Sequence, residues 1–210
     1  MPRLHVPTLQ PQAELDALGP AERARSIFLP ALAPFPPETW PVVALLPVLD
    51  INGALRAALE ARRPFRGAAP VAGLFACDPF LRLADMATTL RRAGIAAAVN
   101  FPTVQIFEGE TAAALTAVGY RVEAEFRLLQ RLAEQGFTPV ACAISRRAVD
   151  AALGLGLRRI LLHTGVSPPP DPASWWAQLA GHVAIEGGEA LAWGAPTTAQ
   201  VSRPRRRMRL

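Results

Sequence analysis

The chain has 210 residues, of which 51% are hydrophobic and 19% charged, and its formal net charge is +5. This composition is typical of a globular protein and argues against disorder. All 22 basic residues are arginines, so the chain lacks the lysine that a Schiff base, pyridoxal phosphate or a P-loop requires.

The positive charge is concentrated at the C-terminus, where five arginines fall within residues 203–210. Without them, the arginines equal the 17 acidic residues in number, so residues 1–202 are formally neutral. We therefore predict a single domain over residues 1–202, followed by a flexible arginine-rich tail at 203–210. A neutral body gives no reason to expect a nucleic-acid partner.

Targeting signals are missing from the sequence. No apolar run approaches the roughly 20 residues that span a bilayer, and the first residues lack the features of a signal peptide. We expect a cytoplasmic protein without a membrane partner. Cys77 and Cys142 lie far apart in apolar surroundings, which favours reduced thiols over a disulfide.

Short apolar runs alternate with helical stretches along the chain, which predicts an α/β fold with parallel strands. The expected strands are Leu4–Thr8 (weak), Ser26–Leu29, Pro70–Ala76, Ile95–Phe101, Thr138–Ala143, Arg158–His163, His182–Glu186 and a further candidate at Ala190–Trp193. The expected helices cover residues 51–59 with Asp50 or Asn52 as the cap, 83–90, 122–133, 146–153 with Ser145 as the cap, and a short one around Trp175–Leu179.

Repeated β–α units of this kind predict a (β/α) barrel or a doubly wound sheet. A complete eight-unit barrel takes about 250 residues, so the barrel interpretation requires a shortened or degenerate TIM-type (β/α) barrel. A proline-rich stretch between residues 30 and 41 reads as an elaborated loop.

Polar residues follow several of the expected strands, at the edge where parallel α/β folds bind their ligands. Asp78, Asn100, His163 and Glu186 could converge there on a pocket that binds and protonates a small polar ligand. Each also has a structural interpretation: Asp78 as a helix cap, Asn100 as a turn residue, His163 as a packed side chain and Glu186 as a solvated turn residue.

Two glutamates, Glu123 and Glu125, begin the helix after Gly119-Tyr120, where carboxylates complement the helix dipole. They point in opposite directions, so they cannot both serve one site. Three scattered histidines without zinc-ligand spacing predict no recognisable metal site, although a Mg²⁺ site built on Asp78 or a glutamate is compatible with the sequence. The sequence carries no signature of an organic cofactor.

Three segments carry recognisable motifs: Val71–Phe80, Gly94–Val104, which ends Asn-Phe-Pro-Thr-Val, and Gly119–Glu125, which reads Gly-Tyr-x-x-Glu-x-Glu. In their order and spacing they resemble the phosphoenolpyruvate-hydrolase-like TIM-barrel family, which is grouped with the phosphoenolpyruvate mutase and isocitrate lyase superfamily. The resemblance runs from about residue 42 to residue 165. It implies a TIM-type barrel with a pocket at the strand ends for small carboxylate, keto-acid or enolate-forming substrates. Carried over by position, the resemblance implies four catalytic residues, which are Asp78, His163, Asn100 and Glu123. It also implies four residues that bind substrate, which are Cys77, Thr103, Tyr120 and Glu186.

Two functional hypotheses follow. The first is a divergent barrel enzyme of the lyase, hydrolase or isomerase type, with Asp78 or His163 as general acid/base and Asn100 polarising a carbonyl or enolate oxygen. The second is a barrel that lost its chemistry and serves as a ligand-binding or protein-interaction module, which the apolar residues Pro30–Pro34 after the second expected strand favour. A shortened barrel also leaves an open seam, so we expect a homo-oligomer with Trp175-Trp176 and the proline-rich loop as contacts.

Overall fold

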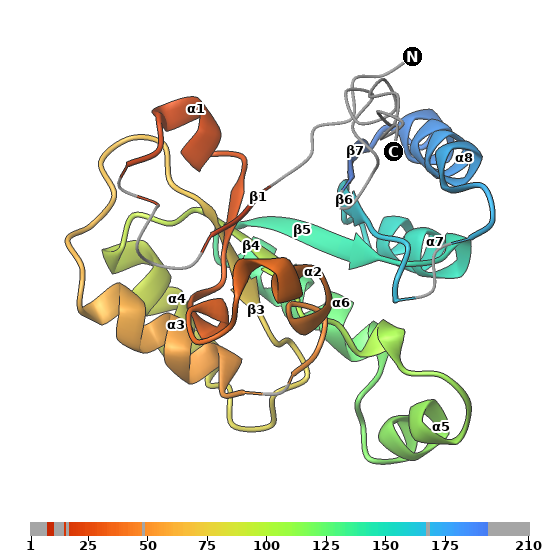
Figure 1. Cartoon of the computed structure of the whole chain (residues 1–210), viewed down its shortest axis with the longest axis horizontal. Coiled ribbons are helices and arrows are strands. Elements are labelled where there is room, and N and C mark those ends of the chain that lie inside the picture. Colours follow the sequence, from red (N-terminus) through yellow and green to blue (C-terminus); the bar gives the residue numbers. More distant parts are fainter. Residues whose placement is uncertain (1–7, 11–14, 16, 48, 167–168, 193–210) are drawn as a thin grey trace, which may run out of the picture.

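Seven parallel strands form one sheet in the computed structural model, which describes residues 8–10, 15, 17–47, 49–166 and 169–192 (Figure 1). The strands are β1 (Thr8–Gln10), β2 (Ser26–Phe28), β3 (Val71–Leu74), β4 (Ala97–Asn100), β5 (Thr138–Ala143), β6 (Arg159–Leu162) and β7 (Glu189–Ala192). Each strand pairs with the next one along the chain, from β1 to β7. A doubly wound sheet would reverse this order at a switch point, so the fold is the shortened TIM-type barrel. Within the described residues no pairing joins β7 to β1, and the sheet is a curled half-barrel.

Helices connect the strands, and α3, α4, α6, α7 and α8 cover the outside of the sheet (Figure 1). They are α1 (Pro20–Arg23), α2 (Trp40–Val43), α3 (Ile51–Glu60), α4 (Leu83–Arg92), α5 (Gly109–Ala117), α6 (Val122–Glu134), α7 (Arg146–Gly154) and α8 (Pro172–Ile185), with short 3-10 turns η1 (Pro30–Leu32), η2 (Pro37–Thr39) and η3 (Val104–Ile106). Asp50 and Ser145 cap α3 and α7 as expected, since their side chains accept from the backbone amides of Gly53 and Ala148.

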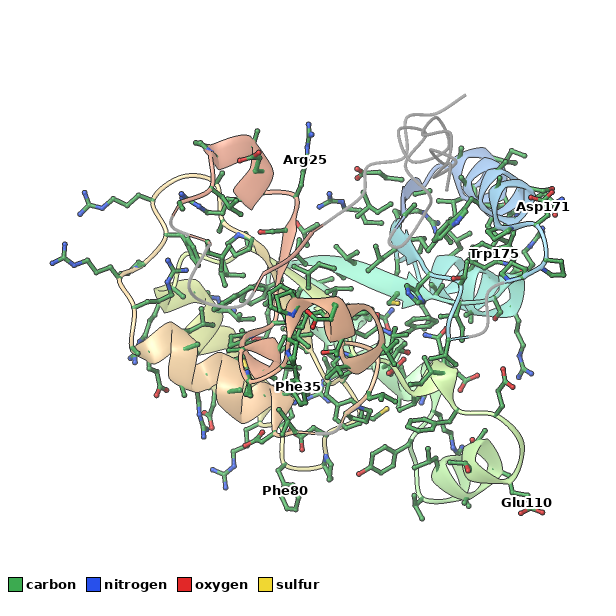
Figure 2. The ribbon with its side chains drawn as sticks, in the orientation of Figure 1. Arg25, Phe35, Phe80, Glu110, Asp171 and Trp175 are labelled. Atoms are coloured by element: carbon green, nitrogen blue, oxygen red, sulfur yellow. The ribbon has the colours of Figure 1, made fainter. Side chains whose placement is uncertain are left out.

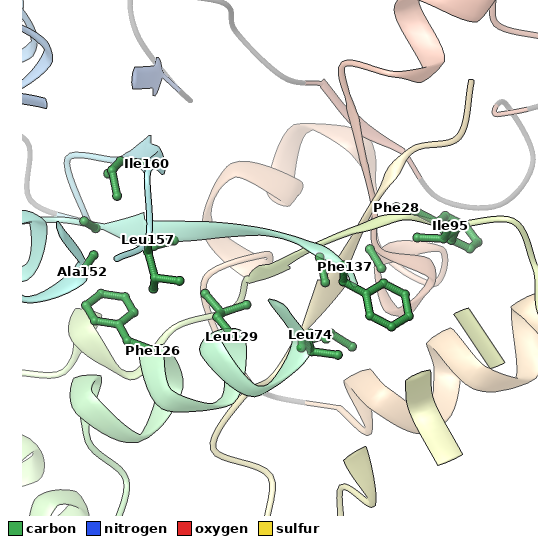
Figure 3. Packing of buried hydrophobic residues seen from close by; sticks show 14 of the residues in the cluster. Phe28, Leu74, Ile95, Phe126, Leu129, Phe137, Ala152, Leu157 and Ile160 are labelled. Atoms are coloured by element: carbon green, nitrogen blue, oxygen red, sulfur yellow. The ribbon is translucent and has the colours of Figure 1, made fainter. Parts of the chain in front are cut away.

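The strands alternate their side chains between two apolar clusters. The outer cluster lies between the sheet and its helices; Phe126 and Leu129 of α6 lie near Leu157 there (Figure 3). The inner cluster lies on the concave side of the sheet and includes Val99, Val140 and Leu161, which also line a hollow of about 260 Å³. The proline-rich segment contributes side chains to this cluster. Ala31 and Leu32 of this segment are almost completely buried, as are Ala44 and Leu45 just after it, whereas residues 33, 34 and 36–38 are exposed.

One expected strand is wrong. Residues 182–185 form the last turn of α8, and Glu186 caps its C-terminus. The helical spacing of the buried residues Trp176, Leu179, Ala180 and Val183 continues through this segment and overrides the alternation of Val183 and Ile185. The expected strand at Ala190–Trp193 is β7, and its last residue lies outside the described residues.

Several predictions concern residues that the structure does not describe. Most of the weak strand at Leu4–Thr8 and the whole arginine-rich tail lie outside the described residues. In the part that is described, no helix is long and apolar enough to cross a membrane. The cytoplasmic location stays a prediction.

Candidate functional site

A hollow of about 600 Å³ lies at the carboxyl ends of β4, β5 and β6. Its walls come from the segments that follow these strands, from α5, and from the first turns of α6 and α7. Its polar lining residues are Gln105, Glu108, Thr116, Tyr120, Arg121, Glu123, Ser145, Arg147 and Thr164. The hollow therefore lies where barrel proteins bind their ligands, and it falls within the usual size of a small-molecule site.

Charged groups of both signs line this hollow. Arg147, in the first turn of α7, is exposed, and so is Glu123 in the first turn of α6. An arginine beside a helix N-terminus is suited to a carboxylate, because the guanidinium and the helix dipole both favour negative charge. Tyr120 adds a hydroxyl that can donate a hydrogen bond.

Beneath the hollow, the second glutamate of α6 organises a fully buried polar network. Glu125 is 0% exposed. Its Oε2 accepts hydrogen bonds from Thr103 Oγ1 at 2.7 Å and Asn100 Nδ2 at 2.9 Å, and its Oε1 accepts from the backbone amide of Val104 at 2.9 Å. Asn100 Oδ1 in turn accepts from the amide of Cys142 in β5 at 2.7 Å. The network ties the segment after β4 to α6 and β5.

Burial dominates the ionisation of Glu125. Removal from water raises the pKa of this carboxyl from 4.5 to about 7, although the donors on Thr103, Val104, Asn100 and Gln105 all favour the charged form. The carboxyl therefore keeps its proton to a higher pH than an ordinary glutamate does, and the chain supplies its hydrogen-bond partners.

Gln105 connects this network to the hollow. Its Nε2 donates to Thr103 Oγ1 and to the carbonyl of Cys142, both at 2.8 Å, and its Oε1 accepts from the amide of Ile144 at 3.2 Å. The side chain bridges the ends of β4 and β5 and lines the hollow from below. The floor of the hollow is thus held in place by side-chain hydrogen bonds.

Asp78 lies at a different place on the same edge of the sheet. Its Oδ2 accepts from Asn52 Nδ2 at 2.8 Å, and its Oδ1 accepts from the amide of Phe80 at 2.8 Å. Asn52, which is 5% exposed, also exchanges hydrogen bonds with the backbone of Phe75. Asp78 and Asn52 line a separate hollow of about 270 Å³ between α3 and α4. The structure therefore gives Asp78 a role in holding the segment after β3.

His163 is 5% exposed at the end of β6. Its Nδ1 accepts a hydrogen bond from the amide of Gly165 at 2.8 Å, and its ring lies 6.4 Å from that of Phe101. Burial lowers the pKa of His163 from 6.5 to about 4, so the imidazole is neutral at physiological pH. It does not line either hollow.

The residues expected to bind substrate are dispersed. Tyr120 lines the 600 Å³ hollow, whereas Thr103 is 0% exposed inside the Glu125 network. Cys77 is half-buried and donates to the carbonyl of Arg121 at 3.6 Å; burial above all, and also the charge of Glu125, raises the pKa of its thiol to about 12. Glu186 lies ahead of β7, at the opposite end of the strands, because the strand expected to precede it is part of α8.

The structure thus brings Glu123 and Tyr120 together at one hollow and joins Asn100 to Thr103 in the buried network beside it. Asp78, His163, Cys77 and Glu186 do not line that hollow. Sequence reasoning missed Glu125, Gln105, Arg147 and Asn52. For Glu125 a signal was present, since it falls four residues before Leu129 and seven before Leu132, on the buried stripe of α6.

In the described part of the chain, no group of three or more His, Cys, Asp or Glu side chains is arranged to hold a metal ion.

Comparison with known proteins assigns the family. The model of the phosphoenolpyruvate hydrolase-like family matches residues 41–169, more than half of the chain. The chain belongs to the phosphoenolpyruvate hydrolase-like family. The matched region includes β3 to β6, the Glu125 network and every residue that lines the 600 Å³ hollow except Trp175.

Relatives of this phosphoenolpyruvate hydrolase-like chain include a bacterial and a plant protein. It is 32% identical over 165 residues to the uncharacterized protein y4oT of Sinorhizobium fredii (strain NBRC 101917 / NGR234), covering 75% of this chain and 83% of that protein. It is 30% identical over 129 residues to the ToMV resistance protein Tm-1(GCR237) of Solanum lycopersicum, covering 60% of this chain but only 17% of the tomato protein.

Proposed function

We propose that this barrel binds a small carboxylate or keto acid in the 600 Å³ hollow and acts on it by general acid/base chemistry. The observation that carries the proposal is the position of the hollow at the carboxyl ends of β4, β5 and β6, with Arg147 and Glu123 both lining it. Membership in the phosphoenolpyruvate hydrolase-like family supports a barrel enzyme of this type.

Three of the lining residues have a chemical role in this proposal. Arg147 and the N-terminus of α7 receive the carboxylate of the substrate. Glu123 removes a proton from the carbon next to the carbonyl, and the electron pair of the C–H bond becomes the enolate. The hydroxyl of Tyr120 donates a hydrogen bond to the developing enolate oxygen. These roles replace Asp78 and His163, which are held in other hydrogen bonds.

Binding is tested by thermal shift with pyruvate, oxaloacetate and phosphoenolpyruvate as probes, because a ligand of the native state raises the melting temperature. We expect at least one probe to raise it for the wild type and none to do so for Arg147→Ala. Arg131→Ala, an exposed arginine at the other end of α6, is the matched control and should keep the shift. A shift that survives in Arg147→Ala would contradict the proposed binding mode.

Chemistry is tested by following a bound probe in deuterated water by NMR. Glu123→Gln should bind with unchanged affinity but lose exchange or turnover by roughly 100-fold or more, the usual contribution of a general base. Glu134→Gln, on the exposed side of the same helix, should behave as the wild type. Equal rates in Glu123→Gln and the wild type would remove Glu123 from the reaction.

A second candidate function is a non-catalytic ligand-binding module. It is favoured by one observation: Asp78, Asn100 and His163 face no common cavity, and each is held by hydrogen bonds within the chain. The same two experiments separate the candidates. A binding module shows the thermal shift, and the probe exchanges and reacts no faster than in the same deuterated solution without protein.

A further inference from the structure

The last strand of the sheet, β7, has one edge that no described strand pairs with. The amide of Glu189 donates to the carbonyl of Arg158 at 2.7 Å, so the N–H groups of Glu189 and Leu191 face β6. Because successive residues of a strand alternate, the N–H and C=O groups of Ala190 and Ala192 face the seam, which is the open side of the sheet between β7 and β1. An unpaired edge of this kind is a template for a further strand.

The free edge of β7 is nevertheless covered at its end. Ala192 is 0% exposed, and its side chain belongs to the outer cluster. In the described part of the chain, only β6 and α8 pack closely against β7. One of them lies beside the strand and the other over its outer face, so neither covers the backbone groups that face the seam. The burial of Ala192 therefore requires a cover that the described elements do not supply.

The seam also borders the 260 Å³ hollow on the concave side of the sheet. The lining of this hollow includes Ile27 of β2 and Leu191 of β7, so both ends of the sheet contribute to it. In a complete barrel, side chains from all the strands fill this interior. The hollow thus marks the place of the strand that is missing between β7 and β1 in the described part.

The sequence directly after β7 has the pattern of a returning strand. Residues 194–196 (Gly-Ala-Pro) are typical of a turn, and three of the five residues of the next segment, 197–201 (Thr-Thr-Ala-Gln-Val), are β-branched. Ala199 and Val201 alternate with polar residues and would lie on one face of an extended segment. The four residues of β7 span about 13 Å, so a segment of five residues is long enough to run back along the whole strand.

We propose that residues 197–201 turn back after β7 and pair antiparallel with its free edge. A three-residue loop at 194–196 sets Ala199 opposite Leu191 and Val201 opposite Glu189. Opposite residues of an antiparallel pair share a face, so Ala199 and Val201 point into the hollow that Leu191 and Glu189 line. A slip of one residue would turn the polar face of the segment inward, which the apolar lining opposes. This proposal does not depend on the substrate or on catalysis.

The charges at the amino end of β7 suit the residues that follow. Past Val201, the same register brings Arg203 near Glu186, which is exposed and forms no ion pair with another described residue. Arg159, at the mouth of the 260 Å³ hollow, is already paired with Glu189 at 2.8 Å. Arg25, on the β2 side of that mouth, is exposed and extends away from the ribbon (Figure 2). The arginine-rich residues then lie at the opposite end of the barrel from the 600 Å³ hollow.

The returning segment removes the basis on which a homo-oligomer was expected. A seam that the chain covers itself offers no free edge to a second copy. The expected tryptophan contact is also reduced. Trp176 is 3% exposed within the outer cluster, so it is not available to a partner, whereas Trp175 is half-buried and lines the 600 Å³ hollow.

Methyl NMR of the full chain tests where the segment lies. We expect nuclear Overhauser effects from the methyl groups of Ala199 and Val201 to those of Leu191 and of the other aliphatic residues that line the 260 Å³ hollow. Their absence overturns the proposal. Contacts to the hollow from residues 1–7 instead would assign the seam to the segment before β1. In a mixture of isotope-labelled and unlabelled chains, contacts found only between the two kinds of chain would assign it to a second copy, and either result also overturns the proposal.

Amide hydrogen exchange tests the register. The proposed pairing directs the N–H of Thr198 toward Ala192 and the N–H of Ala199 away from β7. Thr198→Pro removes a hydrogen bond of the ladder and should speed exchange at Ala190 and Ala192 tenfold or more. Ala199→Pro is the matched control, because it introduces the same residue where no bond to β7 is lost, and it should keep the wild-type rates. Unprotected amides at Ala190 and Ala192 in the wild type, or equal rates in the two variants, overturn the proposed pairing.

Discussion

Glu123 and Glu125 lie two residues apart on α6 and have opposite environments. Glu123 is exposed and lines the 600 Å³ hollow, whereas Glu125 is completely buried and holds the segment after β4 through hydrogen bonds to Asn100, Thr103 and Val104. One short motif therefore places one carboxylate at the hollow and another in the scaffold. A polar residue at a strand end can serve either purpose, and its hydrogen-bond partners distinguish the two.

The largest expected effect comes from removing the buried carboxylate. Glu125→Ala leaves the side chains of Asn100 and Thr103 and the amide of Val104 without their acceptor, which should lower the free energy of unfolding by about 4 kcal/mol. Glu123→Ala should change it by less than about 0.5 kcal/mol. Urea unfolding of both variants measures the contrast; similar losses would show that the two glutamates share one role.

The pH dependence of stability sharpens the same comparison. The raised pKa of Glu125 removes about 3 kcal/mol of stability as pH rises from 4.5 to about 7, because the unfolded chain ionises first. The lowered pKa of His163 removes a similar amount as pH falls from 6.5 to about 4, because the unfolded chain is protonated first.

These two contributions oppose each other over nearly the same pH range. We expect the unfolding free energy of the wild type to vary little between pH 4.5 and 6.5, and that of Glu125→Gln to rise with pH over this range as the contribution of His163 is unmasked. Urea unfolding at several pH values measures both profiles. Parallel profiles for the two proteins would contradict a protonated Glu125 in the folded state.

Asn52 offers a smaller test at the neighbouring strand end. Asn52→Ala removes hydrogen bonds to the backbone of Phe75 and to Asp78, and should cost about 2 kcal/mol. Asp78→Asn keeps an oxygen acceptor and should cost about 1 kcal/mol. Neither variant should change the affinity for a ligand of the 600 Å³ hollow. A loss of affinity in Asp78→Asn that exceeds its loss of stability would return Asp78 to the active site.

Substitution of Glu123 is expected to have the smallest effect on stability and the largest effect on function. Glu123→Gln should unfold at the same urea concentration as the wild type while losing proton exchange on the bound probe. The two measurements on one preparation separate a structural role from a chemical one. A coupled loss of stability would place Glu123 in the scaffold.

The sequence predicted the repeating frame of the fold well, because strands buried on both faces and capped helices leave local signals. The strand Thr138–Ala143 was predicted with its bounds, and the Ser145 cap follows from a side chain acting on its own helix. The helix α5 carries no amphipathic pattern and has no buried residue, so periodicity could not reveal it. The segment 182–186 was misassigned because alternation over a few residues resembles a strand.

The candidate site was harder to predict from the sequence than the fold. Which residues come together there depends on how far the sheet curls and on where the loops fold back. Asp78 follows a strand and Glu123 begins a helix, and both positions are typical of ligand-binding residues. The two side chains nevertheless line different hollows. Asp78 accepts a hydrogen bond from Asn52, which is 26 residues away in the chain. Asn100 donates one to Glu125, which is 25 residues away. Such partners are set by tertiary structure and leave no local spacing to find.

Backbone amide NMR during titration with pyruvate, oxaloacetate or phosphoenolpyruvate tests the central claim most directly, because it reports which hollow a ligand enters. We predict that the binding probe shifts the amides of Gln105, Ser145, Arg147 and Gly165 around the 600 Å³ hollow, and leaves those of Asn52, Gly53 and Asp85 in place. Shifts confined to the second group would place the ligand site between α3 and α4 and contradict the assignment.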